Sequence, residues 1–175
     1  MADVSAIFGI LLSLGIVFPG LLTAWWLLFP ATVERARLRL EVSPWPCFWL
    51  GGVVTAGLVI PIVILLALPI GPAKLAGWVL MGGALAFASL GAAGLAAKMA
   101  GRLTQLGGPA SPLGAFVRAA LALELAAAFP VIGWLVVIPL ATVTALGATV
   151  FALLRWTPRT ASADQPLSSV APHTA

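Results

Sequence analysis

The stretch from Ser111 to Trp156 constrains the fold of this chain most. It has 46 residues, almost all apolar, and its one break is Phe129-Pro130-Val131-Ile132-Gly133-Trp134. As a single straight helix it would measure about 69 Å at about 1.5 Å per residue. The hydrocarbon core of a bilayer is only about 30 Å thick. The stretch therefore either crosses a membrane twice or crosses once with its first part in the interface.

The composition indicates that lipid is the solvent. Of the 175 residues, 62% are hydrophobic and 8% are charged, whereas a soluble domain has about 25% charged residues. The net charge of +4 is better explained by membrane topology than by nucleic-acid binding. The sequence predicts an all-α polytopic transmembrane domain over residues 1–156. Residues 157–175 are predicted to be a flexible cytoplasmic tail, because they have too few large apolar residues to build a core.

Three apolar runs before Ser111 are each long enough to cross a bilayer. They are predicted as spans at Val4–Phe29, Phe48–Ile70 and Leu75–Ala97, with Lys98–Pro112 as a polar loop. Pro61 cannot donate to the carbonyl of Gly57, so we expect Thr55 or a neighbouring helix to cover that carbonyl.

The only strongly charged loop runs from Pro30 to Pro46. Its residues predict a short helix with a narrow apolar face made by Val33, Ala36 and Leu40. One interpretation is a cytoplasmic connector lying on the lipid headgroups. The other is a docking surface for a partner or an anionic lipid.

Basic residues favour five spans over four. With five, Leu113–Phe129 and Ile132–Arg155 both cross, and eight of the nine basic residues lie on or near one side, with Lys74 alone on the other. Basic loops mark the cytoplasm, so this arrangement puts the N-terminus outside and the C-terminus in the cytoplasm, as for a multi-pass protein of a bacterial inner membrane. The alternative is four spans plus one interfacial helix, which moves Arg155 and Arg159 outside.

Tryptophan positions agree with five spans, since indole rings favour the membrane interface. All seven then fall near span ends. The inner belt would hold Trp25, Trp26, Trp45, Trp49 and Trp156, and the outer belt would hold Trp78 and Trp134. Membrane-surface contact is also expected for Arg35, Arg37, Arg39 and Arg118, the last by extending its side chain to inner phosphates.

Helix-packing or partner contacts are predicted at two places. Small residues recur every four positions in the third span and offer a smooth face for another helix of this chain or of another subunit: Ala84, Ala88, Ala92, Ala96 and Ala100. The second place is Glu124, a lone carboxyl that is expensive in lipid and would be protonated there. We expect it to hydrogen-bond Thr142, Thr144 or a carbonyl freed by Pro139, or else to contact another subunit or serve a proton pathway.

Sites of catalysis or cofactor binding are not expected. The chain has one cysteine and one histidine, whereas metal and haem sites usually need several such ligands. No triad, paired carboxylate or phosphate loop is present. The predictions are therefore no enzyme activity, no catalytic residues, no cofactor and no metal.

Residues 101–155 contain Gly101-Arg102-Leu103, Ser111-Pro112-Leu113, the Phe129–Trp134 segment and a Gly-, Ala- and Leu-rich close. This part resembles a membrane domain found in bacterial proteins alongside bactofilin-like, polymer-forming cytoskeletal modules. The resemblance implies a structural membrane domain without catalytic residues.

The sequence therefore predicts a non-enzymatic accessory or assembly subunit. Its partners would be the lipid bilayer and other subunits of a larger membrane complex, respiratory or photosynthetic, and not nucleic acid. The alternatives are a small transporter or channel, and a membrane anchor for cytoplasmic or cytoskeletal partners.

Overall fold

The computed structural model describes residues 2–107, 111–129 and 131–156. These residues form six α-helices and one short π-helix, without a β-strand, which confirms the predicted all-α class for this part of the chain. The elements in chain order are α1 (Ala2–Leu28), α2 (Pro30–Val42), α3 (Pro44–Ala67), α4 (Gly71–Gln105), α5 (Pro112–Ala128), the π-helix η1 (Gly133–Val137) and α6 (Ile138–Leu153). The predicted tail lies outside the described residues.

Prolines set where most helices begin. One stands in the first turn of α2, α3, α4 and α5, where its missing N–H costs no hydrogen bond. Pro139 stands in the first turn of α6 but follows η1 within the continuous segment Gly133–Leu153. Ser111 adds a side-chain cap to α5, accepting a hydrogen bond from the backbone N–H of Gly114 at 3.1 Å. Pro19 and Pro61 instead lie inside α1 and α3, which continue through them.

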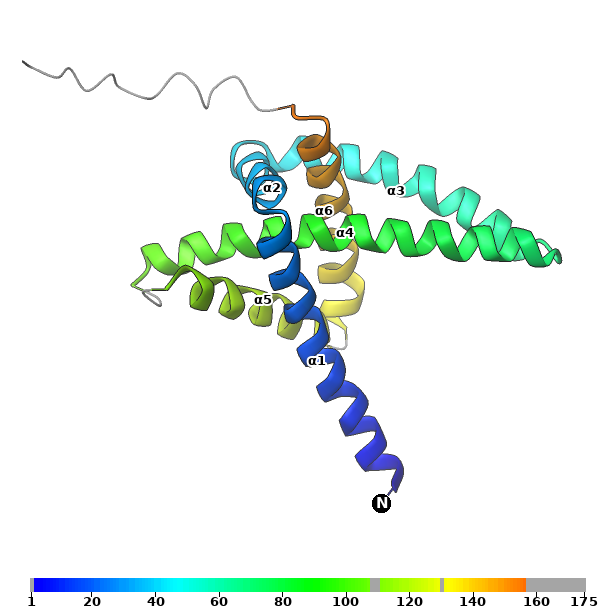
Figure 1. Cartoon of the computed structure of the whole chain (residues 1–175), viewed down its shortest axis with the longest axis horizontal. Coiled ribbons are helices and arrows are strands. Elements are labelled where there is room, and N and C mark those ends of the chain that lie inside the picture. Colours follow the sequence, from blue (N-terminus) through cyan, green and yellow to red (C-terminus); the bar gives the residue numbers. More distant parts are fainter. Residues whose placement is uncertain (1, 108–110, 130, 157–175) are drawn as a thin grey trace, which may run out of the picture.

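The helices do not form a parallel bundle (Figure 1). The helix α3 and the first part of α4 lie side by side as an antiparallel pair joined at residues 68–70, and we call this pair the arm. Helices α1 and α6 cross the direction of the arm near the middle of the molecule. The helix α5 lies along the second part of α4 and also contacts α1.

Three helices in the described part of the chain are long and apolar enough to cross a membrane. They are α3, α4 and the continuous segment Gly133–Leu153, which joins η1 and α6. A fourth candidate is the pair formed by Gly15–Leu28 and α2, which bends by 106° at its break. The helix α5 has 17 residues, close to the shortest length that spans. The architecture is compatible with a multi-pass membrane protein.

Two segments outside the predicted spans are helical. Residues 71–74, between the second and third predicted spans, are the start of α4, and the predicted polar loop from residue 98 is helical as far as Gln105. Alanine and leucine between Lys98 and Gln105 favour helix, and the Gly- and Pro-rich residues follow only afterwards. At 35 residues, α4 is about 52 Å long. This length exceeds the thickness of a bilayer core. Lys98 and Arg102 lie on the same continuous helix as the apolar residues before them.

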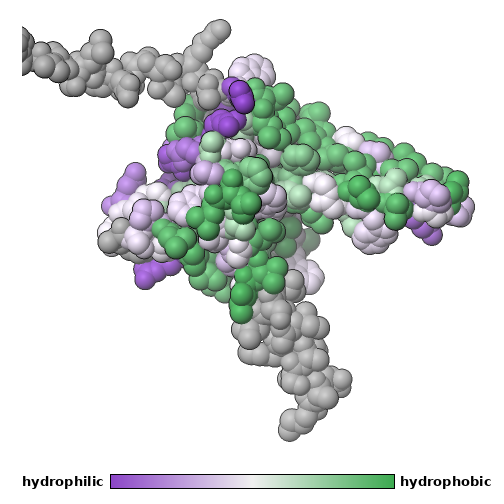
Figure 2. Space-filling view, viewed as in Figure 1, coloured by the Kyte–Doolittle hydropathy of each residue, from purple (hydrophilic) through white to green (hydrophobic). Residues whose placement is uncertain are grey.

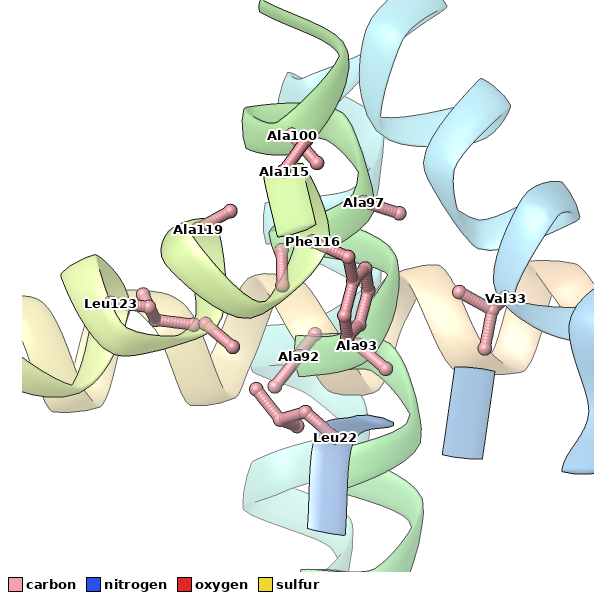
Figure 3. Packing of buried hydrophobic residues seen from close by; sticks show 13 residues of the cluster. Leu22, Val33, Ala92, Ala93, Ala97, Ala100, Ala115, Phe116, Ala119 and Leu123 are labelled. Carbon is pink, nitrogen blue, oxygen red and sulfur yellow. The ribbon is translucent and has the colours of Figure 1, made fainter. Parts of the chain in front are cut away.

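The largest core cluster lies where α1, α4 and α5 meet (Figure 3). Phe116 of α5 is fully buried against alanines of α4, and Leu22 of α1 belongs to the same cluster. A second cluster joins α2, α3 and α6 through Ala36, Leu40, Cys47, Ala148, Phe151 and Ala152. Small side chains dominate both clusters, so helix backbones approach each other closely.

Candidate packing and interaction sites

The helix α6 crosses α3 and α4 at glycines. A Cβ atom at Gly147 would overlap the carbonyl oxygen of Cys47 on α3, and one at Gly51 would overlap the carbonyl oxygen of Val143 on α6. At the crossing with α4, a Cβ atom at Gly91 would overlap the carbonyl oxygen of Ala145. These three positions have no room for any side chain, so the position of α6 depends on them.

Thr149 links α6 to α4 by a hydrogen bond at the same crossing. Its side chain is fully buried, and its hydroxyl lies 2.9 Å from the carbonyl oxygen of Phe87 on α4. The same hydroxyl also lies 2.9 Å from the carbonyl oxygen of Ala145 in its own helix. The bond satisfies a hydroxyl that would be costly to bury unpaired. Neither Thr149 nor the pair Gly51 and Gly147 was singled out by sequence reasoning, because their importance depends on which helices cross.

The predicted alanine stripe faces the interior of the chain along most of its length. Ala88, Ala92, Ala96 and Ala100 are buried, and the last three belong to the cluster that α4 shares with α5. Ala84 is only half-buried. Of the two predicted uses of the stripe, these burials favour packing within the chain.

The apolar face of α2 packs on protein. Val33, Ala36 and Leu40 are buried, and a Cβ atom at Gly94 of α4 would stand 2.7 Å from the Cβ of Ala36. The apolar face of α2 is therefore covered by protein, because Gly94 of α4 lets α2 approach closely. That the connector lies on the lipid headgroups stays a prediction for its exposed face.

Basic side chains connect α2 to α4 and α6. Arg35 donates a hydrogen bond of 2.9 Å to the carbonyl of Ala152 in the last turn of α6. The guanidinium carbon of Arg39 lies 4.2 Å from the ring centre of Phe151. Lys98 of α4 donates a hydrogen bond of 2.7 Å to the carbonyl of Leu40 near the end of α2. A cation near a helix C-terminus also interacts favourably with the helix dipole.

Arg37 is half-buried and lies between two exposed glutamates. It forms ion pairs with Glu34 and Glu41 along α2. The side-chain hydrogen bond to Glu34, together with the charges of both glutamates, raises the pKa of Arg37 above its ordinary value. Exposed ion pairs of this kind contribute about 0–1 kcal/mol to stability. They therefore stabilise α2 slightly and do not determine its position against the other helices.

The tryptophans divide into two groups. Trp45, Trp49, Trp78, Trp134 and Trp156 are each exposed by 61% or more, as expected for rings at a membrane surface. Trp25 and Trp26 are half-buried and differ from that expectation. The indole N–H of Trp25 donates to the Ser89 hydroxyl at 2.9 Å, and Trp26 stacks on Phe116 at 5.1 Å between ring centres. These two rings therefore join α1 to α4 and α5.

Glu124 lies at the contact between α5 and α1. Its Oε1 atom is 4.0 Å from the position that a Cβ on Gly15 would take. Its Oε2 atom is buried and has no hydrogen-bond partner among the residues that the structure describes. The expected bond to Thr142 or Thr144 is not formed, since α5 packs on α4 and α1 rather than on α6. The Thr144 hydroxyl is 2.7 Å from the Leu140 carbonyl instead.

Thr55 likewise differs from expectation. Its hydroxyl donates to the carbonyl of Gly51 at 2.7 Å and not to the carbonyl of Gly57 that Pro61 leaves free. Arg118, predicted to reach the membrane surface, is exposed on α5.

A groove of about 400 Å³ opens between α2, α3, α4, α5, η1 and α6. Its lining is almost wholly apolar, and Lys98 is its one charged residue. Within the described residues, no three His, Cys, Asp or Glu side chains lie together in a way that could hold a metal ion.

Comparisons with protein-family models, with curated proteins and with solved structures each gave no match. The resemblance of residues 101–155 to the bactofilin-associated membrane domain stays a prediction.

Proposed function

We propose that this chain is a non-enzymatic integral membrane accessory or assembly subunit that packs against a larger membrane complex. The observation that carries the proposal is the arm, whose apolar surface is left open by the rest of the chain. Only 11% of the most apolar part of α3 is buried inside the molecule.

Large apolar side chains cover the arm (Figure 2). Exposed on α3 and on the first part of α4 are Val53, Val59, Ile60, Val63, Ile64, Leu75, Val79, Leu85 and Phe87. A surface of this kind needs lipid or protein against it, and lipid tails would cover it without any particular pattern of small residues.

Glycines of the arm give the pattern that favours protein. A Cβ atom at Gly57, Gly82 or Gly83 would meet nothing within 4 Å, so packing inside the chain does not require glycine there. Glycine inside a helix costs about 1 kcal/mol relative to alanine. In membranes, small residues lie where two helices approach closely. The carbonyl of Gly57, which Pro61 leaves without a helical donor, adds an acceptor for a polar side chain of the partner.

The proposed setting is a bacterial inner membrane crossed five times, with the N-terminus outside. Support comes from the hydrogen bond of Arg35 to the last turn of α6, which brings α2 and the C-terminal end of the domain to one side. The competing arrangement leaves α5 in the interface and crosses four times.

Copurification tests the proposal. The tagged chain, extracted from its native membrane in a mild detergent, should bring a stoichiometric membrane partner with it. Gly57→Leu and Gly82→Leu should remove that partner without lowering the melting temperature of the chain itself, because both positions are open. Val63→Leu, at an exposed position on the same arm, is the matched control and should keep the partner. Retention of the partner by both glycine variants would contradict the proposal.

A small transporter is the second candidate, and Glu124 is the observation that favours it. Its Oε2 atom is buried without a hydrogen-bond partner among the described residues, and a carboxyl inside a membrane can carry a proton. We expect Glu124→Gln to behave like the wild type in assembly and in proton flux across liposomes. Glu124→Leu should raise the free energy of unfolding by about 1–3 kcal/mol, since it removes a buried polar atom that lacks a partner. Intact assembly with abolished proton flux in Glu124→Gln would favour the transporter over the accessory subunit.

A further inference from the structure

The groove is apolar along its walls and charged at one end. Its lining includes Leu40, Trp45, Phe48, Leu95, Leu123 and Val137. Lys98 and Leu40 lie at the α2 end, and Val137 belongs to the π-helix before α6. At about 400 Å³, the groove falls within the range of about 300–1,000 Å³ that is typical of small-molecule sites.

The charge of Lys98 has no counter-ion among the residues that the structure describes. Its ammonium group donates one hydrogen bond to the Leu40 carbonyl and has three protons to give. Neither ion pair of the described residues includes Lys98, since both belong to Arg37. No aspartate or glutamate lines the groove.

A second polar group near this end also lacks a partner. The hydroxyl oxygen of Ser43 is buried without a hydrogen bond among the described residues. Ser43 directly precedes Pro44, which lines the groove. The hydroxyl of Thr144, in contrast, is satisfied by the carbonyls of Leu140 and Ala141. Lys98 and Ser43 therefore place unmet hydrogen-bonding capacity near the α2 end.

We propose that this groove binds an anionic phospholipid, with one acyl chain against the apolar walls and the phosphate accepting hydrogen bonds from Lys98. A phospholipid matches both parts of the site, whereas an apolar partner helix would leave the ammonium charge unpaired in a desolvated place. Charge-assisted bonds from an ammonium group to phosphate are among the stronger hydrogen bonds in proteins. The inference requires that the chain lies in a membrane, but not that it has a partner subunit.

Lipid binding to the purified full-length chain tests the inference. The probes are phosphatidylglycerol and phosphatidylcholine with identical acyl chains, added in a neutral detergent and followed by native mass spectrometry and thermal unfolding. Phosphatidylglycerol should bind more tightly and raise the melting temperature more. Lys98→Gln should weaken its binding by about tenfold or more and abolish the preference. Arg102→Gln, an exposed cation on the same helix, is the control and should keep the preference.

A second pair of variants keeps the test decisive, because Lys98→Gln also removes the hydrogen bond to α2. Ala141→Leu narrows the groove and should weaken binding of both lipids, whereas Ala126→Leu, at an exposed alanine of α5, should not. Equal affinity of the wild type for the two lipids would overturn the inference. The inference would also be overturned if Lys98→Gln kept the preference for phosphatidylglycerol. It would be overturned too if Ala141→Leu changed the oligomeric state of the chain and left lipid binding unchanged.

Discussion

At the scale of single residues, glycine has two distinct uses in this chain. Gly51, Gly91 and Gly147 stand where helix backbones touch, and any side chain there would strike a neighbouring carbonyl. Gly52 and Gly57 stand in open space on the same helix as Gly51. The sequence alone does not separate these uses, since adjacent positions of α3 carry the same residue for opposite reasons.

The neighbouring pair Gly51 and Gly52 provides the sharpest test of the crossing. Gly51→Ala should lower the free energy of unfolding by about 1–3 kcal/mol, as for an overpacked core, because the methyl group would force α3 away from the Val143 carbonyl. Gly52→Ala should be neutral or stabilising by up to about 1 kcal/mol, since alanine favours helix and meets nothing. Thermal unfolding of both variants in detergent measures the difference, and an equal effect of the two would disprove the backbone contact.

At the scale of elements, the sequence predicts where helices lie along the chain better than it predicts which helices pack against each other. Runs of apolar residues and prolines locate α1, α3, α5 and the joined segment Gly133–Leu153 to within a few residues, because these signals are local. The neighbours of Glu124 and Trp25 could not be predicted, since both contacts depend on α1 lying against α4 and α5. The alanine stripe of α4 could be predicted as a packing face, but not that α5 covers it.

The packing partner of α2 could not be predicted from the sequence either. The charge and narrow apolar face of α2 predict a surface helix, and the two glutamates that pair with Arg37 are exposed. What places its apolar face on protein is Gly94, a residue of α4 that lies far along the chain. An amphipathic pattern identifies the face that is buried, and the partner that buries it must be found in the fold.

At the scale of the whole molecule, contacts between distant helix ends bear on how the chain crosses a membrane. Arg35 near the start of α2 bonds the last turn of α6, and Lys98 of α4 bonds the end of α2. In an arrangement that crosses a membrane, these contacts require the bonded helix ends to lie at the same depth. In a four-span arrangement, the end of α6 would instead lie about 30 Å away across the hydrocarbon core.

Reporter fusions test this topology directly. Fusions at Lys74 and Ile132 should report the outside, and fusions at Arg37, Gln105 and Trp156 the cytoplasm. The reason is that basic loops stay in the cytoplasm and that the contact between Arg35 and Ala152 requires α2 and the end of α6 to share a side. The fusions at Ile132 and Trp156 discriminate, because four spans with α5 in the interface would exchange their sides while leaving the other three unchanged. A cytoplasmic Ile132 with an outside Trp156 would exclude five spans and would also break the contact between α2 and α6, so the same pair of fusions tests both the topology and the packing.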